Sequence, residues 1–201
     1  MLSVNSQIFE YVKRNRRGKI FFTTDLRNTG SSDAVRQELS RLCRKGIIVR
    51  LSAGMYLYPK LHKYLGVLFP SVEEIIKSIS RKEKSRLIPA GSYALNKLGL
   101  STQVPMKIVF LTDGAPRVMK IGKKLTINLQ KTTAKNLAFK GRITLLTVSA
   151  LKEIGKDKVS DAQMNKIKEV LKHEPNQIIK HDAALAPEWI SILLLKCLHH
   201  E

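Results

Sequence analysis

The chain has 201 residues, of which 36 are Lys or Arg and 16 are Asp or Glu, so its formal net charge at pH 7 is +20. This length corresponds to one large domain or two small ones, and 43% hydrophobic residues suffice for a buried core. The charge excludes a neutral surface and makes a polyanion the first partner to consider.

No segment has the composition of a membrane span or a secretory signal. The longest apolar run, residues 189–195, includes Ser191 and is much shorter than the roughly 18 residues that cross a bilayer. Residues 1–19 lack an apolar core of the secretory type. The only cysteines, Cys43 and Cys197, indicate neither a disulfide scaffold nor a four-ligand metal site. We therefore expect a cytoplasmic protein without a membrane partner.

The positive charge is concentrated in the first two thirds of the chain. Residues 1–70 and 71–135 each contain 13 Lys or Arg and 4 Asp or Glu, whereas residues 136–201 contain 10 and 8. The net charges are therefore +9, +9 and +2. A surplus that only kept the surface soluble would not need this distribution, although scattered Lys and Arg often do no more than that. The distribution favours a polyanion-binding region within residues 1–135.

The first 68 residues show the pattern of a winged helix-turn-helix domain. Helices are predicted at residues 3–14, 24–28 and 32–45, with a short extended piece at 19–22 after the first. Two strands follow at residues 47–51 and 55–58, joined by the small turn Ser52-Ala53-Gly54. A third helix packed on two others and followed by a hairpin is the arrangement that places this helix in the major groove of DNA.

The third helix has two distinct faces. Val35, Leu39, Leu42 and Cys43 share one side, so Cys43 is interpreted as a core residue and not as a nucleophile. Ser31 or Ser32 can cap the helix and Gly46 can end it. The opposite side is polar and mostly cationic, and it carries Ser32, Asp33, Arg36, Gln37, Ser40, Arg41 and Arg44.

This polar side matches the side chains that read duplex DNA. Arg36, Gln37 and Arg41 can form bidentate hydrogen bonds to base edges. Phosphate contacts are expected from Ser40, Arg44, Arg50 and Ser52. The cluster that contains Arg16 and Arg17 either contacts phosphate as well or only favours the carboxyl end of the first helix. An ordinary solvated helix, or a protein-docking winged domain, is the alternative for the whole region.

Residues 69–201 are predicted to form a second, mixed domain, which makes the fold class α+β. Ser71 follows Pro70 and can cap a helix whose apolar stripe is Val72, Ile75, Ile76 and Ile79. After a short helix at 92–98, strands at 107–111, 118–121 and 125–129 form a small sheet within about 86–130. Helices occupy about 143–199, and Pro187 lies in the first turn of the last one.

Basic side chains surround the predicted strands of this second domain. They are Lys107, Arg117, Lys120, Lys123, Lys124 and Lys131. Alternation along the strands would place several of them on one face, as a second basic surface for an anion. A solvated outer face is an equally good interpretation. Tyr93 and the segment 101–103 contact a partner or serve the local fold, with a turn favoured for the segment.

No catalytic or metal site is indicated. A nucleotidyltransferase needs a Gly-Ser followed closely by two carboxylates, yet no acidic residue follows Gly91-Ser92 until Asp113. Gly122-Lys123 lacks the spacing and the hydroxyl residue of a phosphate-binding loop. The five histidines show no metal-ligand spacing. We therefore expect a protein that is not an enzyme and has no cofactor.

Three stretches resemble the AbiEi-like antitoxins of type IV toxin-antitoxin and abortive-infection systems. They are LSRLCRKGIIVRLSAGMYLYPK, IPAGSYALNKLGLSTQVPMKIVFLTDG and LQKTTAKNLAF, and the likeness covers nearly the whole chain. GLSTQVP with KIVFLTDG is the most particular part. The resemblance implies an N-terminal winged helix that represses its own operon and a C-terminal domain that counteracts a nucleotidyltransferase toxin. It also implies that residues 32–41 read DNA and that residues 50–54 form the wing.

The sequence therefore predicts an autorepressor and antitoxin of a phage-defence system. Its expected partners are the promoter DNA of its own operon and a paired nucleotidyltransferase toxin, bound directly or not. The chain shows no heptad seam, which leaves a monomer and a weak dimer open. The alternative is an RNA-binding or protein-docking adaptor that uses the same charge without reading DNA sequence.

Overall fold

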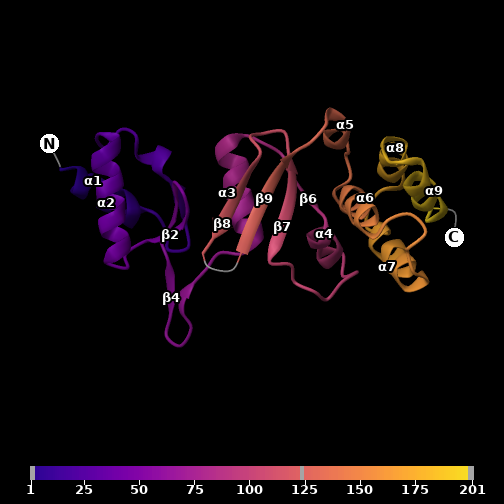
Figure 1. The fold of residues 1–201 in the computed structure, drawn as a ribbon, viewed down its shortest axis with the longest axis horizontal. Coiled ribbons are helices and arrows are strands. Elements are labelled where there is room, and N and C mark those ends of the chain that lie inside the picture. Colours follow the sequence, from indigo (N-terminus) through magenta and orange to yellow (C-terminus); the bar gives the residue numbers. More distant parts are fainter. Residues whose placement is uncertain (1–2, 123–124, 199–201) are drawn as a thin grey trace. The chain divides into compact units, whose positions relative to one another are not determined.

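A computed structural model describes residues 3–122 and 125–198. These residues fold into an α+β protein with three small sheets and a helical C-terminal segment (Figure 1). They form two compact units, one from the described residues of 1–82 and 119–124, the other from those of 83–118 and 125–201. The boundary predicted after residue 68 precedes helix α3 (Val72–Glu83), whereas the first unit extends through α3 to Lys82.

The first unit begins with helices around a three-stranded antiparallel sheet of order β1-β3-β2. Its elements are α1 (Val4–Arg14), β1 (Ile20–Phe22), the 3-10 helix η1 (Thr23–Leu26), α2 (Ser32–Arg44), β2 (Val49–Ser52) and β3 (Met55–Leu57). The short helix predicted at 24–28 is found as this 3-10 helix, which begins one residue earlier and ends two residues earlier. Local side-chain bonds replace helical ones here, since Asp25 accepts from Phe22 N at 2.8 Å and Thr29 Oγ1 donates to Leu26 O at 2.8 Å.

One hydrophobic core holds this part of the unit together. It contains Ile8, Val12, Phe21, Leu26, Val35, Leu39, Leu42, Ile48 and Tyr56. The predicted inner face of α2 is confirmed, since Val35, Leu39 and Leu42 are at most 3% exposed and Cys43 packs against the same core. Two helices on a small sheet, with a hairpin after the second helix, are compatible with a winged helix-turn-helix.

The sequence pattern gave no sign of the next hairpin. Strands β4 (Lys60–His62) and β5 (Gly66–Leu68) form a separate two-stranded antiparallel sheet. Helix α3 then follows, with Ile75, Ile76 and Ile79 buried as predicted. The Lys82 ammonium lies 2.5 Å from the Asp25 carboxylate, which ties α3 to η1.

The second unit is built on a sheet of order β6-β7-β9-β8. The elements are β6 (Leu87–Ala90), α4 (Ser92–Lys97), β7 (Lys107–Thr112), β8 (Arg117–Ile121) and β9 (Leu125–Lys131), and residues 119–121 of β8 belong to the first unit. Consecutive strands β7 and β8 are not neighbours. Instead β7 pairs with β9 in parallel, with Ile108 beside Ile127, and β6 pairs antiparallel to β7. Strands β7, β8 and β9 were predicted, whereas β6 was not.

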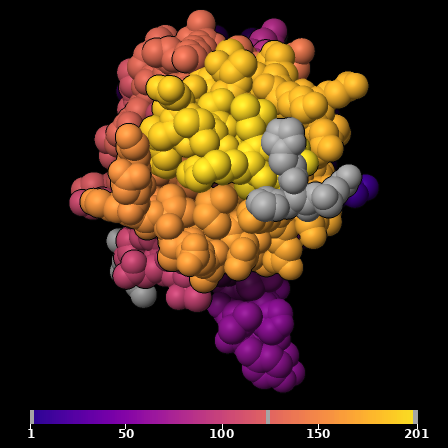
Figure 2. Space-filling model, turned by 90° about the vertical axis from the view of Figure 1, so that its right-hand side faces the viewer, coloured from indigo at the N-terminus to yellow at the C-terminus, as the bar shows by residue number. Residues whose placement is uncertain are grey.

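Five helices complete the second unit. They are α5 (Ala134–Leu137), α6 (Arg142–Ile154), α7 (Asp161–Leu171), α8 (Asn176–Leu185) and α9 (Glu188–Lys196). Helices α7 to α9, coloured orange to yellow, lie together in the second unit (Figure 2). Their apolar sides enclose a core with α6, in which Leu151, Ile190 and Leu194 are completely buried.

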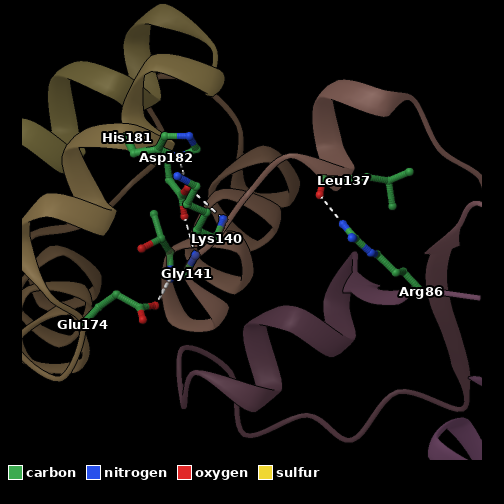
Figure 3. A network of polar contacts seen from close by, with 8 residues as sticks. Arg86, Leu137, Lys140, Gly141, Glu174, His181 and Asp182 are labelled. Carbon is green, nitrogen blue, oxygen red and sulfur yellow. Dashed lines mark hydrogen bonds and ion pairs between the residues drawn. The ribbon is translucent and has the colours of Figure 1, made fainter.

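Two carboxylates from α8 and the turn before it clasp the start of α6 (Figure 3). Asp182, fully buried, accepts from Lys140 N at 2.9 Å and from Gly141 N at 2.8 Å, while its neighbour His181 bonds to it at 2.8 Å. Glu174 accepts from Ile143 N at 2.7 Å. Free N–H groups at a helix start attract anions, so this part of the acidic charge in the last third is structural.

Candidate nucleic-acid interface

Helix α2 is delimited by capping interactions at both ends. Ser31 Oγ accepts from Ala34 N at 3.3 Å, so Ser31 is the N-cap. After the last turn Gly46 has a φ of +67°, and Ile47 N donates to Leu42 O at 3.0 Å, which closes the helix end. These caps, together with the buried inner face, fix which side of α2 faces solvent.

The solvent side of α2 carries most of the predicted DNA-reading residues. Ser32, Asp33, Arg36, Gln37, Ser40 and Arg44 are all exposed. Arg36 Nη2 donates to Ser32 Oγ at 2.8 Å, and Arg36 Nη1 lies 3.6 Å from the Asp33 carboxylate. Exposed ion pairs of this kind contribute about 0–1 kcal/mol. Arg36 can therefore exchange these local contacts for a ligand at little cost.

Arg41 differs from the other predicted readers because a buried carboxylate holds it. Glu38 Oε2 accepts from Arg41 Nε at 2.9 Å, and Glu38 Oε1 accepts from Arg41 Nη2 at 3.0 Å. The Glu38 side chain is only 10% exposed, whereas that of Arg41 is 40% exposed. This forked pair orients the guanidinium and occupies two of its donors. Sequence reasoning missed Glu38, although its i, i+3 spacing to Arg41 was a visible signal.

A shallow open groove of about 730 Å³ runs along the exposed face of α2. The first turn of α1 forms its other wall. The groove is lined by Val4, Asn5, Ala34, Arg36, Gln37, Glu38, Ser40, Arg41 and Arg44. It therefore brings the predicted base readers and the two predicted phosphate contacts of α2, Ser40 and Arg44, onto a single continuous surface.

The predicted wing is short and held against the body of the unit. Arg50 is exposed and Ser52 is half-buried. The turn does not project freely, because Gly54 O accepts from Thr23 N at 3.0 Å. Burial raises the pKa of the Cys43 thiol, and the nearby Arg50 charge partly opposes this rise. Arg50 thus lies close to the carboxyl end of α2.

The two predicted basic contacts in the loop after α1 differ in their interactions. Arg16 is exposed. Arg17 Nη1 instead donates to Pro59 O at 3.1 Å, and its guanidinium lies 5.0 Å from the centre of the Tyr58 ring. Arg17 therefore anchors this loop to the end of the wing, although it is exposed as Arg16 is.

Four of the six residues predicted as a second basic surface lie in the described part of the chain. Lys107 and Lys131 lie at opposite ends of the β7–β9 pair and on opposite faces, since Lys107 is beside Thr126 and Lys131 beside Thr112. Arg117 is paired with Glu83. Lys120 is exposed on β8. Lys123 and Lys124 lie outside the described residues.

Tyr93 and the segment 101–103 contribute to the local fold of the second unit. Tyr93 is 6% exposed, and its ring centre lies 5.5 Å from that of Phe110. Ser101 Oγ accepts from Gln103 N at 3.2 Å, and Asn96 Nδ2 donates to Gln103 O at 3.2 Å. These bonds close the turn between α4 and β7.

Within residues 3–122 and 125–198, no group of three His, Cys, Asp or Glu side chains is arranged to hold a metal ion. In the same part of the chain, no helix combines the length and apolar character that a bilayer crossing requires.

A family model described as a family of unknown function, DUF6088, matches residues 7–179. The chain belongs to the DUF6088 family. The DUF6088 match begins inside α1 and ends inside α8, so it includes the whole of α2, the wing and the four-stranded sheet. No curated protein matches the chain at a significant level.

Proposed function

We propose that this protein is a transcriptional autorepressor that binds the promoter of its own operon through α2. The observation that carries the proposal is the exposed row Arg36, Gln37 and Ser40 on a helix whose opposite face is firmly packed. The major groove is about 12 Å wide and admits one α-helix. A rigid helix with cationic and amide side chains on its outer face suits this groove.

The side chains that contact DNA in the proposed complex divide into base readers and phosphate contacts. Arg36 donates two hydrogen bonds to a guanine, and Gln37 pairs with an adenine in the same bidentate manner. Arg41 enters the groove with its guanidinium already oriented by Glu38. Ser40, Arg44, Arg50 and Arg16 contact phosphates, which sets the register of the helix without reading sequence.

The proposal includes a second role, as the antitoxin of a type IV toxin-antitoxin or abortive-infection system. It rests on the resemblance of the GLSTQVP and KIVFLTDG segments and their neighbours to AbiEi-like antitoxins. The partner in this role is a nucleotidyltransferase toxin encoded beside the protein. The protein itself acts in the cytoplasm by binding, as a monomer or a weak dimer, and not as an enzyme or with a cofactor.

The DNA-binding role is tested by titrating the labelled promoter fragment with wild-type protein and three variants. Arg36→Ala and Gln37→Ala each weaken promoter binding by about 1–3 kcal/mol and leave binding to scrambled DNA nearly unchanged. Lys180→Ala, an exposed change on α8, is the matched control and binds as wild type does. Equal affinity of all variants for the promoter would refute the assignment of α2.

The antitoxin role is tested separately by expressing the protein together with the reading frame beside it. Growth arrest by that reading frame, relieved by the wild-type chain, is the expected result. The comparison variant is Gln37→Ala, because this substitution lies in the first unit and leaves the second unit unchanged. If the reading frame encodes no toxin, or if the chain does not relieve arrest, the antitoxin role is rejected and the repressor role is unaffected.

A further inference from the structure

The β4–β5 hairpin projects beyond the rest of the first unit (Figure 1). It is distinct from the β2–β3 wing, whose turn is bonded to Thr23. Its strands pair Lys60 with Leu68 and Leu61 with Val67. An isolated two-stranded hairpin is at best marginally stable in water, so this one depends on specific interactions at its base and tip.

The base of the hairpin is fixed to the loop after α1. Gly18 N donates to Tyr58 O at 2.6 Å, and Tyr58 N donates to Lys19 O at 3.0 Å. Gly18 has a φ of +90°, and a Cβ at this position would lie 2.7 Å from Lys60 Cε. The positive φ favours glycine at this position, and the Lys60 side chain packs against the loop that carries Arg16.

The tip of the hairpin is organised by one side chain. His62 Nδ1 accepts from Tyr64 N and from Leu65 N, each at 3.3 Å. The tip therefore has a definite conformation that presents Tyr64 and Leu65. Both bonds use main-chain donors, so substitutions of the Tyr64 and Leu65 side chains leave them in place.

The hairpin exposes large apolar side chains to an unusual degree. Leu61 is 63% exposed, Tyr64 82% and Leu65 72%. Apolar side chains grouped on a projecting element mark a contact with another molecule. Since the hairpin has a fixed base and a fixed tip, its conformation suits insertion into a partner better than packing onto its own chain.

The charge around the hairpin indicates what that partner is. No acidic residue lies between Glu38 and Glu73, whereas six Lys or Arg do. Lys60 and Lys63 flank the exposed apolar side chains, and Lys63 Nζ lies 5.5 Å from the Tyr64 ring centre. Apolar wedges flanked by cations are the means by which proteins enter the minor groove of DNA, unstack a base step and kink the duplex by about 20–90°.

We propose that the β4–β5 hairpin is a DNA-bending wedge, in which Leu65 and Tyr64 enter the minor groove between base pairs while Lys60 and Lys63 contact the flanking phosphates. The inference rests on the proposed binding of duplex DNA by α2 and adds a second, independent contact to it. It places the wedge at a flexible pyrimidine–purine step beside the site that α2 reads, because such steps kink most easily.

The test measures bending of a promoter fragment that carries one fluorophore at each end. Wild-type protein is expected to raise the energy transfer between the ends. The double variant Tyr64→Ser/Leu65→Ser keeps the α2 footprint, loses the rise and binds about tenfold more weakly or worse. The control Val104→Ser/Met106→Ser removes two exposed apolar side chains, 78% and 58% exposed, from the second unit and behaves as wild type does.

The remaining outcomes separate this inference from the proposed function. If wild-type protein binds the promoter without bending it, or if the Tyr64/Leu65 variant bends it equally, the wedge is rejected and the role of α2 stands. If wild-type protein does not bind the promoter, both are rejected. Phosphatidylglycerol vesicles are the third probe, since vesicle binding that depends on Tyr64 and Leu65, with unchanged DNA binding, would overturn the wedge in favour of a lipid surface.

Discussion

At the scale of single residues, the pair Glu38–Arg41 determines how the face of α2 must be probed. Six of the seven predicted positions on this face are exposed, but Arg41 also pairs with a carboxylate that is only 10% exposed. A buried charge without its partner costs far more than the pair gains. Arg36 and Gln37 are therefore the informative substitutions for DNA reading, and Arg41 is informative for stability.

Arg41→Ala is expected to lower the free energy of unfolding of the first unit by about 1–3 kcal/mol, because Glu38 loses both of its hydrogen-bond donors. Arg36→Ala, its control on the same helix, changes this free energy by less than about 0.5 kcal/mol. Urea denaturation followed by circular dichroism measures both. An Arg41 variant as stable as the Arg36 variant would show that the forked pair does not form in solution.

The Cys43 thiol reports on the contact between α2 and the wing. Burial raises its pKa and the Arg50 charge lowers it. Since the thiolate is the reactive form, iodoacetamide should modify Cys43 slowly near neutral pH and faster as pH rises. Arg50→Ala removes the lowering influence, so modification at a given pH becomes slower, measured by mass spectrometry in a Cys197→Ser background. Faster modification of the Arg50 variant would contradict this arrangement.

At the scale of elements, caps and apolar periodicity allowed α2 to be predicted closely. Residues 32–45 were expected and Ser32–Arg44 are found, because Ser31, Gly46 and the stripe Val35–Leu39–Leu42 are all local signals. Strand β6 escaped prediction because Leu87–Ala90 is short and contains Pro89. The β4–β5 hairpin escaped it because both its faces are mostly exposed, so no alternation of apolar and polar residues exists there.

The candidate site was predictable only where it depends on local pattern. The exposure of Arg36, Gln37 and Ser40 follows from helical periodicity. The bond from Thr23 N to Gly54 O, which holds the wing turn, joins positions far apart in sequence and has no local signature. The same is true of Arg17, whose partner Pro59 lies 42 positions away.

The clasp at the start of α6 gives a prediction for the second unit. Asp182→Ala leaves the main-chain N–H groups of Lys140 and Gly141 without their acceptor, and the free energy of unfolding should fall by about 2–3 kcal/mol. Asp161→Ala, which removes an exposed carboxylate from the first turn of α7, should cost at most about 1 kcal/mol. Thermal denaturation compares the two. Equal losses would mean that Asp182 has no special structural role.

At the scale of the whole molecule, a net charge of +20 makes association with any polyanion dependent on salt. Protein–DNA affinity falls with ionic strength in proportion to the number of phosphates neutralised. Charge alone therefore cannot distinguish a sequence-reading repressor from an adaptor that binds RNA. The distinction lies in what the α2 face adds to this common attraction.

Arg50→Ala should weaken binding to promoter and random DNA alike and reduce the slope of log affinity against log salt by about 1. Gln37→Ala, which removes no charge, should leave this slope unchanged. Fluorescence anisotropy between about 50 and 200 mM salt provides both slopes. A reduced slope for Gln37→Ala, or an unchanged one for Arg50→Ala, would contradict the division into base and phosphate contacts.

The most direct test of the central claim is a competition at about 150 mM salt, where non-specific attraction is weak. Labelled promoter DNA bound to the wild-type protein is challenged with unlabelled promoter, random duplex of equal length, and tRNA. The account predicts that promoter DNA competes at concentrations at least about a thousandfold lower than random duplex or tRNA. Equal competition by random duplex, or stronger competition by tRNA, would contradict sequence reading by α2.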